Sequence, residues 1–203
     1  MNAKLKICGM KDAQNIQDVL SVKPDYLGFI FYKPSKRYVD NLSAEFVKQL
    51  KGVKKVGVFV DEQPDVIKTI IDAYGLDAVQ LHGHESPATV EIIRAFGVIV
   101  IKAFGIGAHF DWEQLAAYEK MVDYYLFDTK TVAHGGSGES FDWDLLKQYK
   151  GRLPYFLSGG LSPQNMAIAN ALEDTRLFAL DVNSKFELQP GWKDVKLLQA
   201  VFG

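Results

Sequence analysis

Residues 78–103 read AVQLHGHESPATVEIIRAFGVIVIKA, and they contain one full repeat of the pattern that decides the fold. The apolar run at 78–81 has the length of a strand, and the segment at 87–96 spaces its apolar residues as a helix does. The run at 98–101 is apolar at every position, which is typical of a strand covered on both faces of a parallel sheet. This stretch therefore predicts a β–α–β unit.

The same alternation of strand and helix patterns continues along the whole chain. It predicts strands at 5–8, 26–31, 55–60, 78–81, 98–103, 124–128, 155–157 and 177–182, and helices at 11–22, 43–50, 65–74, 87–96, 112–122, 143–149, 163–172 and 192–202. This strict alternation predicts an α/β fold, a single (β/α)8 TIM barrel over residues 1–203. An open doubly wound sheet is the alternative, although no strand leads into the GxGxxG turn of a dinucleotide-binding fold.

Length, charge and cysteine content exclude several classes of protein. The 203 residues suit one domain, and a composition that is 48% hydrophobic and 24% charged excludes a disordered chain. The net charge of −2 provides no basic field for nucleic acid, and the single cysteine excludes an intrachain disulfide. No signal peptide is evident, and no apolar run approaches the ~18 residues of a membrane span. We expect a cytoplasmic protein with neither a nucleic-acid nor a membrane partner.

The chemistry of such a barrel takes place at the C-terminal ends of its strands, where two reactive side chains stand out. Cys8 ends the first predicted strand, and its thiolate would be a competent base for a carbon-bound proton. Asp128 ends the sixth, and a buried carboxylic acid there could protonate a ring oxygen. The alternative is structural: Cys8 as a small buried apolar residue and Asp128 as a capping carboxylate.

The seventh and eighth predicted strands end in sequences that suit a phosphate. Gly159 and Gly160 allow the backbone to approach a ligand and leave N–H groups free to donate, and Asn183 and Ser184 precede the last loop. Barrels often bind phosphate between these two loops, close to helix N-termini. The alternative is an ordinary turn at the two glycines, with Ser162 as the cap of the next helix.

Two further side-chain types could bind ligands. His82 and His84 follow the fourth predicted strand, but a zinc site needs three or four ligands and no second ligand pair ends another strand. We therefore expect no metal, and His82 as a hydrogen-bonding group in the barrel mouth. Arg37 is the best candidate to bind a substrate carboxylate through two parallel hydrogen bonds. A solvated basic loop at 33–37 is the alternative.

Several short motifs follow one another in a fixed order between Lys6 and Phe202. They read Lys6-Ile7-Cys8-Gly9, Gly28-Phe29-Ile30-Phe31, Ser35-Lys36-Arg37, Val56-Gly57-Val58-Phe59, Val79-Gln80-Leu81-His82-Gly83, Phe127-Asp128, Gly135-Gly136-Ser137-Gly138, Phe141-Asp142-Trp143, Leu157-Ser158-Gly159-Gly160-Leu161, Leu180-Asp181-Val182 and Gly191-Trp192-Lys193-Asp194. In this order and near this spacing they resemble the phosphoribosylanthranilate isomerases of tryptophan biosynthesis. Each piece alone is weak, but the full set is very specific.

The resemblance implies an isomerase that converts N-(5-phosphoribosyl)anthranilate to 1-(2-carboxyphenylamino)-1-deoxyribulose 5-phosphate by an Amadori rearrangement. This small phosphosugar-anthranilate is the expected partner, with no cofactor or metal, and we expect a monomer or a homodimer. The family's residue roles transfer to matching positions of this chain: Cys8 as general base, Asp128 as general acid, Arg37 on the anthranilate carboxylate, Gly159, Gly160, Asn183 and Ser184 at the phosphate, and Gln80, His82 and Asp181 at the barrel mouth.

One stretch departs from the family pattern, and three other functions remain as alternatives. Lys185 stands where the family usually has glycine beside the phosphate loop, and we expect its side chain to point to solvent. A related phosphosugar barrel, such as an indoleglycerol-phosphate synthase or a ribulose-phosphate epimerase, would need catalytic lysines or a metal-binding His/Asp set, neither of which is evident. A metal-dependent hydrolase would rely on His82 and His84. A non-catalytic binding barrel would not need both Cys8 and Asp128.

Overall fold

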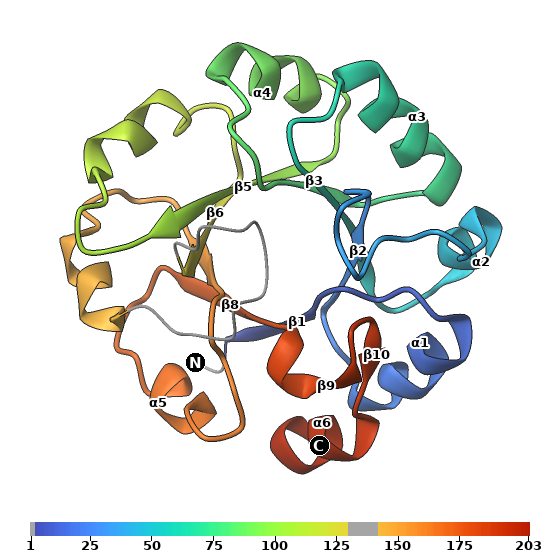
Figure 1. Ribbon diagram of the computed structural model, residues 1–203. Coiled ribbons are helices and arrows are strands. Elements are labelled where there is room, and N and C mark those ends of the chain that lie inside the picture. Colours follow the sequence, from blue (N-terminus) through green and yellow to red (C-terminus); the bar gives the residue numbers. More distant parts are fainter. Residues whose placement is uncertain (1–2, 130–141) are drawn as a thin grey trace.

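The computed structural model describes residues 3–129 and 142–203, and it confirms the predicted barrel. Eight parallel strands close into a ring in chain order, and β8 pairs with β1 (Figure 1). The strands are β1 (Lys4–Ile7), β2 (Tyr26–Ile30), β3 (Lys54–Phe59), β4 (Ala78–Leu81), β5 (Ile99–Ile106), β6 (Tyr124–Thr129), β7 (Tyr155–Leu157) and β8 (Leu177–Val182). The predicted bounds of β4, β7 and β8 agree with these.

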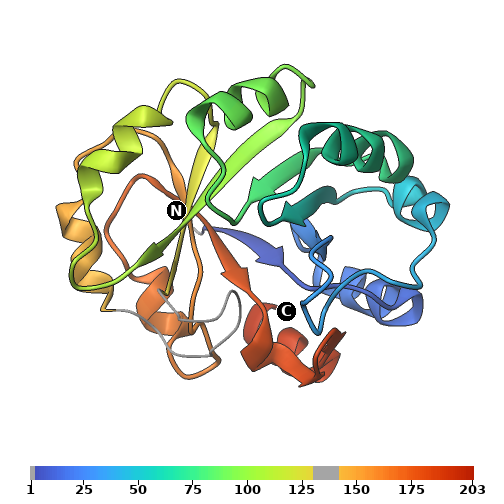
Figure 2. The same ribbon diagram turned by 45° about the horizontal axis from the view of Figure 1, so that its top comes forward.

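Helices cover the outside of the barrel (Figures 1 and 2). They are α1 (Ala13–Val19), which continues into the 3₁₀ turn η1 (Leu20–Val22), then α2 (Ala44–Gln49), α3 (Pro64–Tyr74), α4 (Pro87–Arg94), α5 (Met166–Asn170) and α6 (Val195–Phe202). Local sequence sets their ends. For example, Ser86 caps α4 by accepting the Thr89 N–H, and Gly75 ends α3 in a left-handed conformation. None of the helices in the described part of the chain has the length and apolar character of a membrane span.

Two predicted α-helices are 3₁₀ helices instead. The segments predicted at 112–122 and 143–149 form η2 (Trp112–Ala117) and η3 (Trp143–Gln148). In each, the preceding aspartate caps the N–H two residues further on, and the closing bonds span three residues, as in Tyr118 N–H to Leu115 C=O. Apolar spacings of three suit both helix types over so short a length, so the periodicity did not distinguish them.

The last two predicted helices are shorter than expected. The helix predicted at 163–172 is reduced to α5, because turns occupy the residues before Met166. The helix predicted at 192–202 begins only at Val195. Its first residues belong to a two-stranded antiparallel hairpin, β9 (Glu187–Gln189) with β10 (Trp192–Lys193), which follows the 3₁₀ turn η4 (Ser184–Phe186). Pairing with residues further back in the chain therefore overrides the local helix pattern.

Alternation along the strands decides which side chains point into the barrel. One apolar cluster fills the interior with Tyr26, Val56, Ala78, Ile101, Ala103, Leu126, Phe156 and Ala179, and a larger one lies between the strands and the helices. On β1, Ile7 belongs to the outer cluster, so Lys6 and Cys8, one position to either side, face inward. On β6, Leu126 and Asp128 share the inward face in the same way. The polar side chains of the site therefore lie directly above the inner core.

Candidate active site

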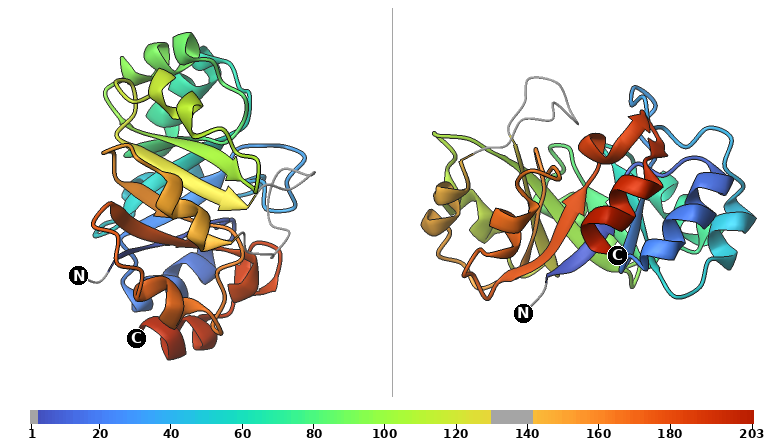
Figure 3. Two further views of the ribbon diagram at one scale, coloured as in Figure 1. Left: turned by 90° about the vertical axis from the view of Figure 1, so that its left-hand side faces the viewer. Right: turned by 90° about the horizontal axis from the view of Figure 1, so that it is seen from below.

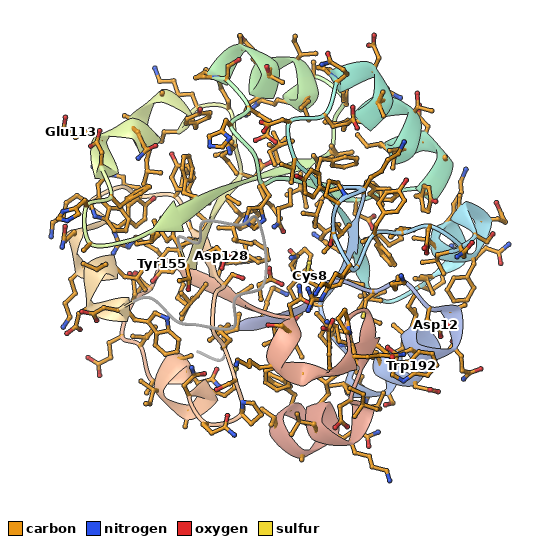
Figure 4. The ribbon with its side chains drawn as sticks, in the orientation of Figure 1. Cys8, Asp12, Glu113, Asp128, Tyr155 and Trp192 are labelled. Atoms are coloured by element: carbon orange, nitrogen blue, oxygen red, sulfur yellow. The ribbon has the colours of Figure 1, made fainter. Side chains whose placement is uncertain are left out.

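Cys8 lies at the C-terminal end of β1, where the fold leaves space for its thiol. The residue is buried, with 4% of its surface exposed, and its N–H donates to Val182 C=O of β8. An ideal Cβ built on Gly28 of β2 would lie 2.6 Å from the Cys8 Sγ. Gly28 is therefore the neighbour that makes room for the sulfur. Figure 4 shows Cys8 and Asp128 on the inside of the ring of strands, reaching its centre from different sides.

A buried ion pair lies beside this thiol. Lys6 Nζ is 2.7 Å from Asp181 Oδ2, and the two side chains are 0% and 4% exposed. Lys6 and Asp181 are also paired in register between β1 and β8. The Asp181 Oδ1 has no hydrogen-bond partner among the described residues. Asp181 thus lies below the barrel mouth and holds Lys6.

The charges around Cys8 act on its thiol in opposite directions. Burial raises the pKa of Cys8, and the positive charge of the Lys6 ammonium works against that rise. Burial also raises the pKa of Asp181, with Lys6 again opposing it. Burial alone would lower the pKa of Lys6, but Asp181 and Cys8 together keep it above its usual value. One buried cation therefore serves two neighbouring acidic groups.

Asp128 belongs to a short polar chain across β4 and β6. Its Oδ2 is 3.3 Å from His82 Nε2, and its Oδ1 accepts the Thr129 N–H at 2.8 Å. The other ring nitrogen of His82 lies 2.9 Å from Gln80 Nε2. Asp128 and His82 are 18% and 23% exposed, so both reach the mouth, whereas Gln80 is buried beneath them. The structure thus brings Asp128 together with Gln80 and His82, two of the residues predicted at the barrel mouth.

Arg37 is held by a residue that is distant in the sequence. Its Nε and Nη2 donate to both carboxylate oxygens of Glu187 at 2.7–3.0 Å, although the two residues are 150 positions apart. Its stem passes Gly9, where an added Cβ would lie 2.7 Å from Arg37 Cδ. The β9–β10 hairpin and the loop after β2 lie side by side at this end of the barrel (Figure 3). Arg37 is therefore not the solvated loop residue of the alternative interpretation.

Lys193 completes this cluster from below. Its buried Nζ lies 2.6 Å from Glu187 Oε1 and 2.7 Å from Asn183 Oδ1. Burial lowers the pKa of Lys193 to about 8, against the pull of Glu187. Burial would raise the pKa of Glu187, but Arg37 and Lys193 bring it below its usual range. Glu187 is thus an ionised anchor shared by two cations.

The loops after β7 and β8 have the backbone expected of an anion site. Gly159 and Gly160 have φ values of +80° and +66°, which glycine adopts without strain. Among the described residues, no acceptor pairs with the backbone N–H groups of Gly159, Gly160 or Ser184. The next helix begins only at Met166, so these N–H groups, rather than a helix terminus at 163, are the donors near the loop. Lys185 is exposed and has no positive φ.

His84, the second histidine after β4, is not part of this cluster. The His84 side chain is 83% exposed and lies 3.6 Å from Asp61, while His82 faces Asp128, so the two histidines do not converge. Within residues 3–129 and 142–203, no three His, Cys, Asp or Glu side chains are grouped as metal ligands. Lys102 packs beneath the helices against Glu85, at 3.1 Å. The glycine-rich motif at 135–138 lies outside the described residues.

Sequence reasoning missed Lys6 and Lys193 as members of the site. A signal for Lys6 existed, because it is a charged residue in a buried strand, two positions before Cys8 and hence on the same face. No comparable signal marked Lys193, because the hairpin that carries it was predicted to be part of a helix.

Comparisons with known proteins point to one family. A family model described as N-(5'-phosphoribosyl)anthranilate (PRA) isomerase matches residues 5–203. The N-(5'-phosphoribosyl)anthranilate isomerase of Parabacteroides distasonis is 41% identical over 198 residues, which cover 96% of this chain and 90% of that protein.

Solved structures agree with this. A phosphoribosyl anthranilate isomerase in complex with reduced 1-(o-carboxyphenylamino)-1-deoxyribulose 5-phosphate superposes with a TM-score of 0.81 at 34% identity, over 98% of this chain and 96% of that one. A monomeric form generated from the dimeric Thermotoga maritima enzyme has a TM-score of 0.78 at 35% identity, covering 97% and 95% of the two chains.

Proposed function

Because the chain belongs to the N-(5'-phosphoribosyl)anthranilate isomerase family, we propose that Cys8 is its general base and Asp128 its general acid. The chain is an isomerase of tryptophan biosynthesis, and its reaction is the Amadori rearrangement of the phosphoribosyl anthranilate to the corresponding aminodeoxyribulose phosphate. The observation that carries the residue assignment is the placement of a buried thiol and a carboxyl on the inward faces of different strands of one barrel mouth.

Asp128 acts first, by protonating the furanose ring oxygen. The bond from C1′ to that oxygen breaks, and the lone pair of the anthranilate nitrogen forms the C=N bond of a protonated Schiff base. The Thr129 N–H on Oδ1 and His82 on Oδ2 fix the orientation of the carboxyl group.

Cys8 then removes the proton from C2′ as a thiolate. The electron pair of that C–H bond forms the C1′=C2′ bond, and the iminium nitrogen is neutralised to give an enolamine. Tautomerisation moves the enol proton to C1′ and leaves the C2′ ketone. The substrate gains one proton at the ring oxygen and one at C1′, and it loses one from C2′ and one from its hydroxyl. The proton balance is zero, so the enzyme returns to its starting state by transferring a proton from Cys8 to Asp128.

Binding uses the two ends of the substrate. Arg37 is presented over Gly9, close to Cys8, with Nε and Nη2 engaged by Glu187, and Nη1 is the group we assign to the anthranilate carboxylate. The phosphate is assigned to the N–H groups of Gly159, Gly160 and Ser184, with Asn183 beside them. Gln80, His82 and Asp181 form the polar floor between these two ends.

The remaining properties stay predictions. A relative with a solved structure is bound to a reduced form of the phosphosugar-anthranilate product, which supports a small-molecule ligand of this class for this chain. The relative from Thermotoga maritima is dimeric, and a monomer or a homodimer remains the prediction here. Cytoplasmic location and the absence of a cofactor are also predictions.

The assignment is tested by turnover, followed as the loss of the anthranilate adduct's fluorescence. Cys8→Ala and Asp128→Asn should each lower kcat by on the order of 10²–10⁴. Circular dichroism and binding of a reduced product analogue serve as the controls, and both should stay close to those of the unaltered protein. A Cys8→Ala protein that keeps most of its kcat would show that the thiol is structural and that another group is the base.

A further inference from the structure

We propose that Lys6 is a positioning residue that stabilises the thiolate of Cys8 from inside the barrel, and that Asp181 limits this effect by sharing the same cation. This inference rests on the proposed role of Cys8 as the base. It adds a residue that does not touch the substrate, because the Lys6 side chain is 0% exposed and lies below the barrel mouth.

Strand β1 places Lys6 and Cys8 close together inside the barrel. Lys6 and Cys8 are separated by one residue on β1, and Ile7 between them packs in the outer cluster, so both side chains enter the barrel on the same face. A fully buried ammonium needs an anionic partner, because leaving it uncompensated would be strongly destabilising. The one partner at ion-pair distance in the described structure is Asp181, at 2.7 Å. The thiol of Cys8, one position further along the same inward face of β1, is the second acidic group on which the charge of Lys6 acts.

The other charged groups near the thiol have weaker effects on its ionisation than Lys6 has. Lys193 of β10 also favours the Cys8 thiolate, but its Nζ is already engaged by Glu187 and Asn183. Asp128 and His82 act on the charge of Asp181. Lys6 is therefore the main cation that opposes the cost of burying a thiolate at position 8.

This arrangement predicts effects of opposite sign from the two partners. In Lys6→Met the thiolate loses the cation that favours it most, whether or not Asp181 stays ionised, so the pKa of Cys8 rises. In Asp181→Asn the ammonium has no carboxylate partner and the Cys8 thiolate becomes its counter-ion, so the pKa of Cys8 falls. A purely structural role of the pair would not produce this reversal of sign.

The experiment is a pH titration of the single cysteine, labelled with ¹³C at Cβ and followed by NMR. Because Cys8 is the only cysteine in the chain, one resonance reports its ionisation without any need for turnover. Lys6→Met should move the midpoint upward by about one pH unit or more, a tenfold change in the ionisation constant. Asp181→Asn should move it downward. The alkaline rise of kcat in Lys6→Met should shift upward with the thiol midpoint.

Lys102→Met is the matched control. Lys102 is equally buried and paired with Glu85, but it faces the helices and does not act on Cys8, so the thiol midpoint should not move even if stability falls. If Lys6→Met alone does not fold, the double variant Lys6→Met/Asp181→Asn keeps the interior neutral, and its midpoint should still lie above that of the unaltered protein.

An unchanged midpoint in the Lys6 variants, or an upward shift in Asp181→Asn, overturns the inference. Failure of the proposed base is a separate result. If Cys8→Ala keeps its turnover while the Lys6 variants shift the thiol midpoint, Lys6 still controls the thiol but the thiol is not the base.

Discussion

The Arg37 guanidinium donates hydrogen bonds to both carboxylate oxygens of Glu187 at N–O distances of 2.7–3.0 Å. This ion pair joins the loop after β2 to the hairpin after β8. The Arg37 and Glu187 side chains are 14% and 3% exposed, so the orientation of the guanidinium is fixed in the folded protein. Because the fork is held by Glu187 before substrate arrives, little side-chain entropy remains to be lost on binding a carboxylate.

Arg37→Ala should therefore act mainly on binding. A hydrogen bond to a charged group contributes about 1.5–3 kcal/mol, so we expect KM to rise by roughly ten- to a hundredfold with kcat changed much less. Arg37→Lys keeps the charge without the planar fork and should give an intermediate KM. Steady-state kinetics check this, and a fall in kcat at constant KM would instead place Arg37 in the chemical step.

Gly28→Ala should misplace Cys8, the proposed base, without altering its chemistry. The added Cβ would lie 2.6 Å from Cys8 Sγ and 3.1 Å from Cys8 Cα, so rotation of the thiol alone cannot relieve the clash. A misplacement on the order of 1 Å can cost about 10²-fold in rate, and we expect a fall in kcat of that size.

Gly57→Ala is the control for this variant, because its Cβ would meet Leu76 and Phe59 on the outer face of β3. It should lower stability and leave kcat unchanged. Equal kcat values in the two variants, at equal losses of stability, would show that the space beside Cys8 is not critical.

Buried tyrosines should make the fold sensitive to alkali. Burial raises the pKa of Tyr26 and Tyr149 to about 12, and it raises that of Tyr125 and Tyr155 above the usual range. Above the ordinary tyrosine pKa of about 10 the unfolded chain releases these protons while the folded chain keeps them. The stabilisation is therefore complete below pH ~10 and is lost as pH rises through about 12.

Urea titrations across this range should show a falling midpoint, and the tyrosinate absorbance of these four residues should appear together with unfolding. Tyr149→Phe removes one of the phenols with a raised pKa, so the urea midpoint should fall less steeply with pH. A stability that stays flat through this range would contradict the prediction.

The barrel was predictable because most of its strands are short, largely apolar runs and each is followed by a helix pattern. The bounds of β4 and β8 agree with the sequence prediction, since runs buried on both faces have clear ends. Contacts between distant residues were not predictable. Arg37 was proposed as a carboxylate ligand, but nothing local marks Glu187 as its anchor, and the hairpin that carries Glu187 depends on pairing with Lys193.

The site residues that could be predicted are those whose positions the barrel topology fixes. Cys8 and Asp128 could be proposed because strand ends in a barrel meet at one mouth, so their positions followed from the topology. The charges that surround the thiol depend on register between strands, as in the pairing of Lys6 with Asp181. Register is fixed by packing of the whole ring, and no single strand sequence determines it.

Lys185→Gly should change little, although glycine is usual at this position in the family that the chain resembles. Lys185 lies in η4 with an exposed side chain and without a positive φ, so this backbone does not need glycine. The proposed phosphate donors are the N–H groups of Gly159, Gly160 and Ser184, which do not depend on Lys185. We therefore expect KM to change by less than about threefold, or roughly 0.7 kcal/mol, with an unaltered dependence on salt.

Lys185→Gln separates charge from backbone flexibility, since it removes the ammonium and keeps a side chain of similar length. Both variants should follow the same curve of KM against ionic strength as the unaltered protein. If the ammonium reached the dianionic phosphate, both would raise KM, and the rise would be steepest at low salt, where a surface charge is least screened. That outcome would make Lys185 a phosphate ligand. A rise confined to Lys185→Gly would instead assign the effect to the added backbone freedom of the loop.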